Sequence, residues 1–273
     1  MTTPAGLVHA FHRLHEAGCF VMPNPWDVGS ARLLAQLGFP ALATTSAGLA
    51  WSLGRPDNGA SLEATLAHLS ALAQAVDVPL NADFTNGFAA EPDGVAENVR
   101  RAAVTGIAGL SIEDSSGDAA DPLYDFELAV ERVRAARQAI DEGGTGVLLT
   151  ARSEGFLVGR PDLAETIRRL TAYAAAGADC LYAPRIEKLA DIGAVVAAVA
   201  PKPVNVLVGA PYTTVGELAA LGVRRISVGG ALARAAWGGF LRAAREIAAR
   251  GTFSALAEAV PFAEIEAAFG EGS

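Results

Sequence analysis

Three carboxylates and one arginine occupy positions where they could act together on a small acid. Asp83, Glu113 and Arg152 each follow directly on a short apolar run, and Asp57 lies in a loop ahead of them. Carboxylates that are held together repel one another unless a cation offsets their charge, and hard oxygen ligands favour Mg²⁺ or Mn²⁺. The planar guanidinium of Arg152 suits a carboxylate or a phosphate. This set predicts the binding of a small chelating acid.

Short apolar runs alternate with amphipathic segments along the chain, and these are the elements that must position the four residues. The apolar runs predict eight strands, at 20–22, 41–45, 78–82, 107–112, 147–151, 180–183, 203–208 and 225–229. Segments with a 3.6-residue period predict helices near 27–37, 61–76, 91–105, 125–141, 161–176, 187–199, 214–221 and 231–249. Such alternation implies parallel strands joined by helical crossovers.

Eight strand–helix units in 273 residues are typical of one closed α/β structure, the (β/α)₈ TIM-type barrel. No low-complexity linker divides the chain, so residues 1–273 are expected to form a single domain. An open, doubly wound sheet is the alternative. Two further amphipathic helices, over 4–17 and 253–270, lie outside the eightfold set.

The active site of such a barrel forms at the carboxyl ends of the strands and in the loops that follow. The polar residues at these positions are Asn24, Asp27, Thr45, Ser46, Asp57, Asp83, Thr85, Glu113, Asp114, Arg152, Glu154, Arg185, Asn205 and Ser227. We interpret Asp27 as a helix N-cap outside the site. Asp114 is expected to be a structural partner of a neighbouring loop, and Asp57 could be only a turn residue. For Arg152, a structural salt bridge is the alternative to substrate binding.

The bulk composition argues against several classes of function. A net charge of −9 and a pI near 5.0 speak against nucleic-acid binding, which needs a clustered basic face. No apolar run approaches the roughly 20 residues of a membrane span, and no secretory signal is visible, so a soluble, cytoplasmic protein is expected. The two cysteines, Cys19 and Cys180, have no metal-knuckle or redox spacing and are expected in the core.

The four histidines all fall in predicted helices away from the strand ends, at His9, His12, His15 and His68. A histidine general base is therefore not expected. The chain also has no glycine-rich dinucleotide fingerprint, although Gly229 and Gly230 follow the eighth strand, where barrels often bind an anion.

Four segments make the chain resemble the isocitrate lyase and phosphoenolpyruvate mutase superfamily over nearly its whole length. Residues 44–48 (Thr-Thr-Ser-Ala-Gly), followed by 53–57 (Leu-Gly-Arg-Pro-Asp), are similar to the second-strand loop of that superfamily. Residues 81–88 (Asn-Ala-Asp-Phe-Thr-Asn-Gly-Phe) are similar to its Ala-Asp-x-Asp-x-Gly-Tyr-Gly motif. Residues 111–114 (Ser-Ile-Glu-Asp) resemble its Ile-Glu-Asp segment, and 150–152 (Thr-Ala-Arg) its substrate-binding arginine. The set is specific as a whole.

Departures from the superfamily pattern narrow what the resemblance implies. Thr85 stands in place of the second Asp of the Asp-x-Asp pair, which removes one carboxylate from the metal shell. Residues 115–124 contain no Cys, Lys or His, whereas isocitrate and methylisocitrate lyases carry a loop with a catalytic Cys there. Pro184 aligns with a Glu of those lyases. The resemblance therefore implies the branch similar to phosphoenolpyruvate mutase and argues against a Cys-dependent isocitrate lyase.

Within that branch, the resemblance implies a Mg²⁺-dependent lyase or decarboxylase that acts on a small 2-oxo acid or related carboxylate through a pyruvate-type enolate. Asp57, Asp83 and Glu113 are expected to hold Mg²⁺, with Mn²⁺ as the alternative ion. Arg152, Ser46 and Asp57 are expected to be catalytic, and backbone amides near Ser46 and Ala47 to stabilise the enolate charge. Substrate binding is expected from Thr45, Ser46, Ala47, Asp83, Arg152 and Asn205.

Two alternatives stay open for the activity. One is phosphorus–carbon chemistry, as in phosphoenolpyruvate mutase or phosphonopyruvate hydrolase. The other is a catalytically weak 2-oxo acid binding protein, which Thr85 and the missing Cys suggest. The sequence indicates no proton donor. In the resembled superfamily a C-terminal helix is exchanged between subunits, so the segment 253–270 implies a homo-oligomer, a dimer or a tetramer.

Overall fold

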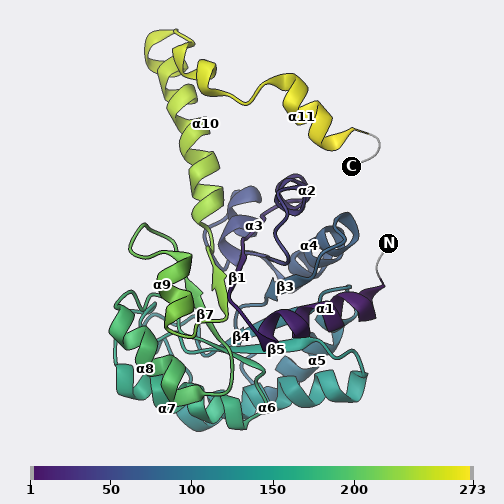
Figure 1. Ribbon diagram of the computed structural model, residues 1–273, viewed down its shortest axis with the longest axis vertical. Coiled ribbons are helices and arrows are strands. Elements are labelled where there is room, and N and C mark those ends of the chain that lie inside the picture. Colours follow the sequence, from purple (N-terminus) through teal and green to yellow (C-terminus); the bar gives the residue numbers. More distant parts are fainter. Residues whose placement is uncertain (1–2, 271–273) are drawn as a thin grey trace.

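Residues 3–270, which the computed structural model describes, contain eight parallel strands that form a nearly closed barrel (Figure 1). The strands are β1 (Phe20–Met22), β2 (Leu42–Ala43), β3 (Leu80–Asp83), β4 (Gly109–Glu113), β5 (Leu148–Arg152), β6 (Cys180–Tyr182), β7 (Val204–Leu207) and β8 (Arg225–Ser227). They pair in the order β1-β8-β7-β6-β5-β4-β3-β2. A hydrogen bond of 3.0 Å from the Ala43 N–H to the Pro23 carbonyl links β2 to the end of β1. The predicted (β/α)₈ barrel is confirmed, and the open-sheet alternative is wrong.

Helices follow the strands in the predicted order and surround the barrel (Figure 1). They are α1 (Pro4–Glu16), α2 (Val28–Gln36), α3 (Ser46–Ser52), α4 (Leu62–Ala75), α5 (Pro92–Ala103), α6 (Phe126–Gly143), α7 (Leu163–Ala175), α8 (Leu189–Val199), α9 (Val215–Ala220) and α10 (Ala231–Arg250). The sequence did not predict α3, because seven residues are too few to display a helical period. None of the helices within residues 3–270 has the length and apolar character needed to cross a membrane.

The prediction of one helix over 253–270 is wrong. The chain forms a short 3₁₀ helix, η1 (Ser254–Glu258), and then a separate helix, α11 (Phe262–Phe269). Pro261 separates the two, because proline cannot donate a backbone hydrogen bond inside a helix. α10 projects away from the barrel and α11 lies back over α2, where the Gln36 side chain donates to the Ala268 carbonyl at 2.6 Å (Figure 1).

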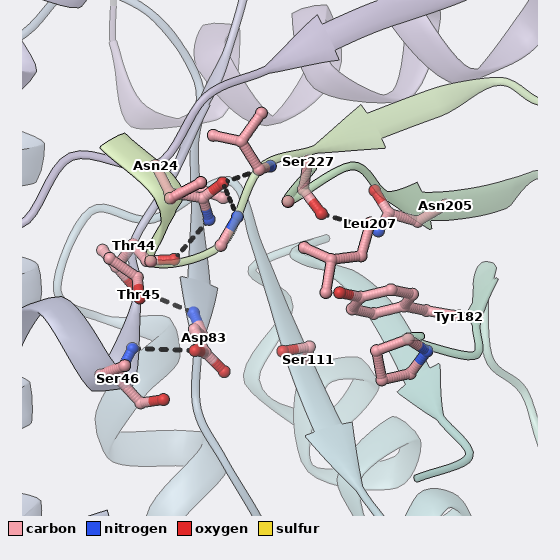
Figure 2. Close-up of a pocket in the computed structure, with 18 of the residues that line it drawn as sticks. Asn24, Thr44, Thr45, Ser46, Asp83, Ser111, Tyr182, Asn205, Leu207 and Ser227 are labelled. Carbon is pink, nitrogen blue, oxygen red and sulfur yellow. Dashed lines mark hydrogen bonds between the residues drawn. The ribbon is translucent and has the colours of Figure 1, made fainter. Parts of the chain in front are cut away.

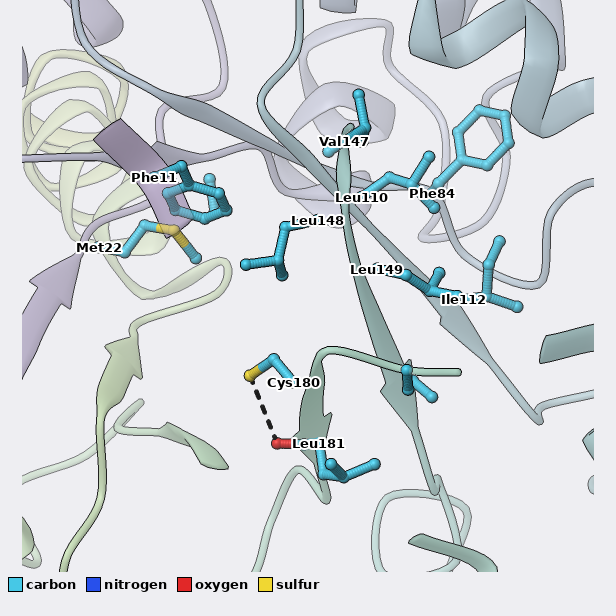
Figure 3. Packing of buried hydrophobic residues seen from close by; sticks show 14 of the residues in the cluster. Phe11, Met22, Phe84, Leu110, Ile112, Val147, Leu148, Leu149, Cys180 and Leu181 are labelled. Carbon is cyan, nitrogen blue, oxygen red and sulfur yellow. Dashed lines mark hydrogen bonds between the residues drawn. The ribbon is translucent and has the colours of Figure 1, made fainter. Parts of the chain in front are cut away.

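The hydrophobic core lies between the strands and the surrounding helices (Figure 3). Successive residues of a strand point to opposite faces, so Leu110 and Ile112 of β4 enter this core while Ser111, between them, lines a cavity inside the barrel. Cys180 is fully buried and Cys19 packs against the core while half-buried, in agreement with their predicted places. The same alternation sends polar residues of the other strands toward the barrel axis.

The helix α1 closes the amino end of the barrel. Phe11 is fully buried there, and Gly109 leaves room for it, since a Cβ atom on this glycine would lie 2.6 Å from the Phe11 ring. Nε2 of His15 lies 3.3 Å from Nη1 of Arg225 at the start of β8. Burial and the charge of Arg225 lower the pKa of His15 to about 3, so the ring is neutral. The carboxyl end of the barrel is therefore the end left open for a ligand.

Candidate active site

A cavity of about 370 Å³ lies at the carboxyl end of the barrel (Figure 2). Ligand pockets span roughly 300–1,000 Å³, so this volume suits a small molecule. Most of the residues predicted for the site line it, namely Thr45, Ser46, Ala47, Asp57, Asp83, Arg152 and Asn205. In Figure 2, Ser46 and Asp83 lie on one side of the cavity, and Tyr182, Asn205 and Ser227 lie on the other.

Glu113 lines a second cavity, of about 280 Å³, which adjoins the first. The two cavities share Thr44, Thr45, Ser46 and Asp83, so these residues form the wall between them. The three carboxylates predicted to converge on one mouth therefore approach from two directions. Asp57 and Asp83 face the larger cavity, and Glu113 reaches the same region from the smaller one.

Asp83 fastens the start of α3 to the end of β3. Its Oδ2 accepts a hydrogen bond of 2.8 Å from the Ser46 N–H, and its own N–H donates to the Thr44 hydroxyl at 2.8 Å. The Ser46 hydroxyl donates to Asp57 at 3.4 Å. The Ser46 amide is thus already occupied, which differs from its predicted use for the substrate. Within residues 3–270, the N–H of Ala47 has no partner, so this amide is available on the cavity wall.

Arg152, at the end of β5, is surrounded by three carboxylates. Its Nη1 donates to Asp83 at 2.8 Å, its Nη2 lies 3.2 Å from Glu113, and its Nε donates to Glu154 at 2.8 Å. The Tyr182 ring packs beside the guanidinium, and its centroid lies 5.1 Å from Cζ of Arg152. Arg152 therefore does make the structural salt bridges that were the alternative to a role in substrate binding. A guanidinium has five N–H donors, so three pairings leave two for a substrate anion.

With all of its carboxyl groups ionised, this cluster would carry more negative than positive charge. Burial raises the pKa of Glu113 well above its ordinary value and raises the pKa of Glu154, although Arg152 opposes both shifts. Desolvation and the charge of Asp83 raise the pKa of Asp57. Oε2 of Glu154 is buried and has no hydrogen-bond partner among residues 3–270. A divalent cation would offset this surplus of negative charge.

The oxygen donors at the site fit Mg²⁺. Within the described part of the chain, no three acidic, cysteine or histidine side chains are close enough to enclose an ion by themselves. Mg²⁺ commonly keeps several waters and takes one or two carboxylates from the protein together with oxygens of the substrate. Asp83 would hold such an ion at the wall shared by the cavities, with Asp57 and Glu113 acting through its waters.

The raised pKa of Glu113 makes a testable difference to stability. A carboxyl group whose pKa is higher in the folded than in the unfolded chain binds its proton preferentially in the folded state, so the free energy of unfolding falls as the pH rises above the ordinary value of 4.5. Without divalent ions, Tm is therefore expected to fall as the pH rises above 4.5. The Glu113→Gln variant is expected to show a flatter profile by scanning calorimetry.

The exposed carboxylate of Glu16, on α1, supplies the matched control for this measurement. Glu16→Gln removes the same charge away from the cavity, so its Tm profile is expected to follow that of the wild type. Equal slopes for Glu113→Gln and the wild type would contradict the assignment of the raised pKa to Glu113.

Asn205 is held on the far side of the cavity by two polar neighbours. Its Oδ1 accepts a hydrogen bond of 2.9 Å from Nε of Arg225, and its Nδ2 donates to the Ser227 hydroxyl at 3.0 Å. Arg225 is fully buried and also donates to Thr150 at 3.0 Å. The orientation of the Asn205 amide is therefore set by the barrel interior, and the predicted substrate contact stays a prediction.

Two residues that sequence reasoning assigned to structural roles occupy those roles. Asp27 caps α2, accepting a hydrogen bond of 2.7 Å from the Ser30 N–H. Asp114 is buried and accepts from the Glu154 N–H at 2.8 Å and from the Tyr173 hydroxyl at 2.7 Å, which ties the end of β4 to the loop after β5 and to α7. Both predictions are confirmed.

Sequence reasoning missed several residues at the site. Glu154 was visible as a polar residue after a strand, but nothing local linked it to the Arg152 guanidinium. Arg234 lines the larger cavity from the first turn of α10. His68 lies in a helix, α4, as predicted, but its side chain lines the smaller cavity, which the sequence did not indicate. Burial lowers the pKa of His68 to about 4, which keeps its ring neutral.

Known proteins share this fold and much of this sequence. A family model described as phosphoenolpyruvate phosphomutase matches residues 11–248. A crystal structure of a "putative lyase/mutase" from Burkholderia cenocepacia J2315 is 49% identical, with a TM-score of 0.95 over 99% of this chain and 98% of that one. An uncharacterized protein of Mycobacterium tuberculosis H37Rv is 34% identical over 260 residues, 94% of this chain and 95% of its own. Oxaloacetate acetylhydrolase, in complex with its product oxalate, is 26% identical with a TM-score of 0.87, over 98% and 96% of the chains.

Proposed function

The chain belongs to the phosphoenolpyruvate phosphomutase family, and from this premise we propose that it is a Mg²⁺-dependent lyase or decarboxylase that cleaves a carbon–carbon bond of a small 2-oxo acid or related carboxylate. The predicted isocitrate lyase and phosphoenolpyruvate mutase superfamily is thereby confirmed, as is an enzyme of the lyase type. The observation that carries the finer proposal is the position of Asp83, which contacts both the Ser46 amide and Arg152 in the wall between two cavities.

The chain's own residues would bind and orient the substrate. The two remaining N–H donors of Arg152 suit the substrate carboxylate, and the free Ala47 amide suits an oxygen that gains negative charge. The Ser46 hydroxyl, hydrogen-bonded to Asp57, lies on the same wall. The chemistry that a bound Mg²⁺ supplies is electrostatic stabilisation of the enolate formed when the carbon–carbon bond breaks.

A substrate panel tests this proposal. Purified protein is incubated with Mg²⁺ and, in separate reactions, with oxaloacetate, 2,3-dimethylmalate, 2-methylisocitrate or phosphonopyruvate, and a coupled assay follows the formation of pyruvate. We expect pyruvate from a carbon acid, at a rate that a chelator abolishes. Reactions without protein correct for the spontaneous decarboxylation of oxaloacetate.

The family description also supports one rival, phosphorus–carbon chemistry on phosphoenolpyruvate or phosphonopyruvate. Release of phosphate from phosphonopyruvate, or its rearrangement to phosphoenolpyruvate, without turnover of any carbon acid, would replace the lyase proposal with this one. Absence of turnover across the whole panel, together with a rise in Tm on adding oxalate, would instead support a 2-oxo acid binding protein.

Substitutions at Thr85 test how much the missing carboxylate weakens metal binding. Thr85 is buried at a φ of 47°, which is unfavourable for a β-branched residue and better tolerated by Asp or Asn. Thr85→Asp restores the carboxylate of the superfamily motif and is expected to tighten Mg²⁺ binding by about tenfold, measured by titration calorimetry. Thr85→Asn, similar in shape but neutral, is the control. Equal Mg²⁺ affinities for the two variants would contradict the prediction.

The C-terminal segment supports a homo-oligomer, a dimer or tetramer. Large apolar side chains are exposed along α10, η1 and α11, including Phe240, Phe253 and Phe262 at 59%, 62% and 80%. Several large exposed apolar side chains on one segment are typical of an interface between proteins. Light scattering is expected to give a dimer or tetramer, and Phe262→Glu to shift the protein toward the monomer. A monomeric wild type would contradict this. The predicted cytoplasmic location stays a prediction.

A further inference from the structure

Arg225, the first residue of β8, is a buried cation without an anionic partner. Its side chain is 1% exposed, and it makes no ion pair with any residue in the described range 3–270. It donates from Nε to Asn205 and from Nη2 to Thr150, and Nη1 lies 3.3 Å from Nε2 of His15. The His15 ring is neutral, because its pKa is lowered to about 3. All three contacts of this guanidinium are therefore neutral groups.

The other two buried arginines of the described chain are better compensated. Arg169 pairs with two carboxylates, and Arg132 donates to three backbone carbonyl oxygens. Neither of them lines a cavity, whereas Arg225 lines the larger one. Burying a cation without an anion costs stability, because the ion loses its hydration, and an apolar side chain would avoid this cost. The cost points to a role for the charge of Arg225 other than stability.

Arg225 lies in the floor of the larger cavity, below the residues predicted to bind the substrate. Its partner Thr150 precedes Arg152 by two positions on β5, and Arg225 precedes Ser227 by two positions on β8. Two residues of a strand span roughly 7 Å, so the guanidinium is one layer of side chains deeper in the barrel than Arg152. The cavity reaches both layers, and the charge of Arg225 therefore faces it from below.

The charges of Arg152 and Arg225 are offset to different degrees. Three carboxylates surround Arg152, whereas Arg225 has none. Burial and the charge of Arg152 lower the pKa of Arg225, so negative charge that forms in the cavity would stabilise this guanidinium and be stabilised by it. A unit charge at about 8 Å shifts an equilibrium by about 30-fold when the effective dielectric constant is about 20.

We propose that Arg225 supplies positive charge beneath the active site and thereby stabilises the enolate that remains when the carbon–carbon bond breaks above it. This inference rests on the proposed function, because it needs an intermediate that carries negative charge. Asn205 lies between the two, since its Oδ1 accepts from Arg225 and its Nδ2 donates to the Ser227 hydroxyl beside the cavity (Figure 2). The positive end of this amide dipole therefore points away from Arg225, and the guanidinium polarises it further in that direction.

Oxalate tests the charge by binding alone, since it resembles the pyruvate enolate in its planar shape and its charged oxygens. Its dissociation constant is measured by titration calorimetry in the presence of Mg²⁺. Arg225→Gln is expected to weaken oxalate binding by about 30-fold. Arg225→Lys keeps the charge and loses the fork of donors, and it is expected to stay within about threefold of the wild type. In steady-state kinetics, Arg225→Gln is expected to lower kcat with little change in KM, because the charge develops in the transition state.

Two further substitutions complete the test. Arg169→Gln makes the same change at a buried site away from both cavities, and it is expected to lower Tm while oxalate binds as in the wild type. His15→Glu keeps Arg225 in place and would set a carboxylate against it from α1, on the side away from the cavity. It is expected to weaken oxalate binding relative to the neutral variant His15→Gln, which keeps the test decisive if Arg225→Gln does not fold.

Wild-type oxalate affinity in a folded Arg225→Gln variant, or an equal loss in the Gln and Lys variants, would overturn the role of the charge. Equal affinities for His15→Glu and His15→Gln would do the same. In each case, oxalate binding and turnover by the wild type would leave the proposed function intact. A wild type that neither binds oxalate nor turns over any acid of the substrate panel would overturn both.

Discussion

Replacement of Arg152 by alanine is expected to lower kcat/KM by about 10³-fold, because truncating a buried, hydrogen-bonded charge commonly removes 2–5 kcal/mol of binding free energy. The same change leaves Asp83, Glu113 and Glu154 without their cation. Breaking a buried ion pair from one side costs about 3–5 kcal/mol of stability, so a marked fall in Tm is expected as well. Steady-state kinetics on the best substrate of the panel and calorimetry measure the two effects.

A variant of Arg169 serves as the control that separates the expected loss of activity in Arg152→Ala from its expected loss of stability. It is buried and pairs with Asp114 at 3.1 Å, but it does not line either cavity. Arg169→Ala is therefore expected to lower Tm while the folded variant keeps a kcat/KM near that of the wild type. Arg152→Lys keeps the charge and loses the fork of donors, so an intermediate activity is expected. A fully active, folded Arg152→Ala variant would assign Arg152 to stability alone.

Replacement of Asp83 by asparagine is expected to lower kcat/KM by about 10³-fold through loss of the divalent ion. The neutral amide is a weaker ligand for Mg²⁺ than a carboxylate. Both oxygens of Asp83 accept hydrogen bonds, from the Ser46 N–H and from Nη1 of Arg152, and in the amide one of these two donors would face an NH₂ group instead of an acceptor. The Mg²⁺ concentration needed for half-maximal rate is expected to rise. Titration calorimetry measures the ion directly.

Asp114 provides the matched control for Asp83. It is buried and hydrogen-bonded to charged and polar donors, but it joins the end of β4 to the loop after β5 and to α7, and it lines neither cavity. Asp114→Asn is expected to lower Tm and leave Mg²⁺ affinity unchanged. If Asp83→Asn bound Mg²⁺ as the wild type does, Asp83 could not be the ligand that we propose.

Local pattern was enough to place the strand-end residues. Asp83, Glu113 and Arg152 each complete the strand whose apolar core the sequence displays, and the two-residue period of a strand turns all three inward. The helix α3 was missed because it is short, and the break at Pro261 because the amphipathic pattern of 253–270 continues across it. Both errors concern segments whose conformation depends on few residues.

The sequence by itself determined the barrel, the strand ends that carry the polar residues, and the resemblance that family comparison confirmed. The tertiary structure alone decided which of these residues meet. Asp83 and Arg152 are 69 residues apart, and their contact depends on the register of β3, β4 and β5. The approach of Glu154 to Arg152 and of Arg234 to the cavity follows likewise from how loops and helices pack on the closed barrel. Periodicity reports the face on which a residue lies, but contacts across a barrel depend on strand register and closure, which no local stretch of sequence contains.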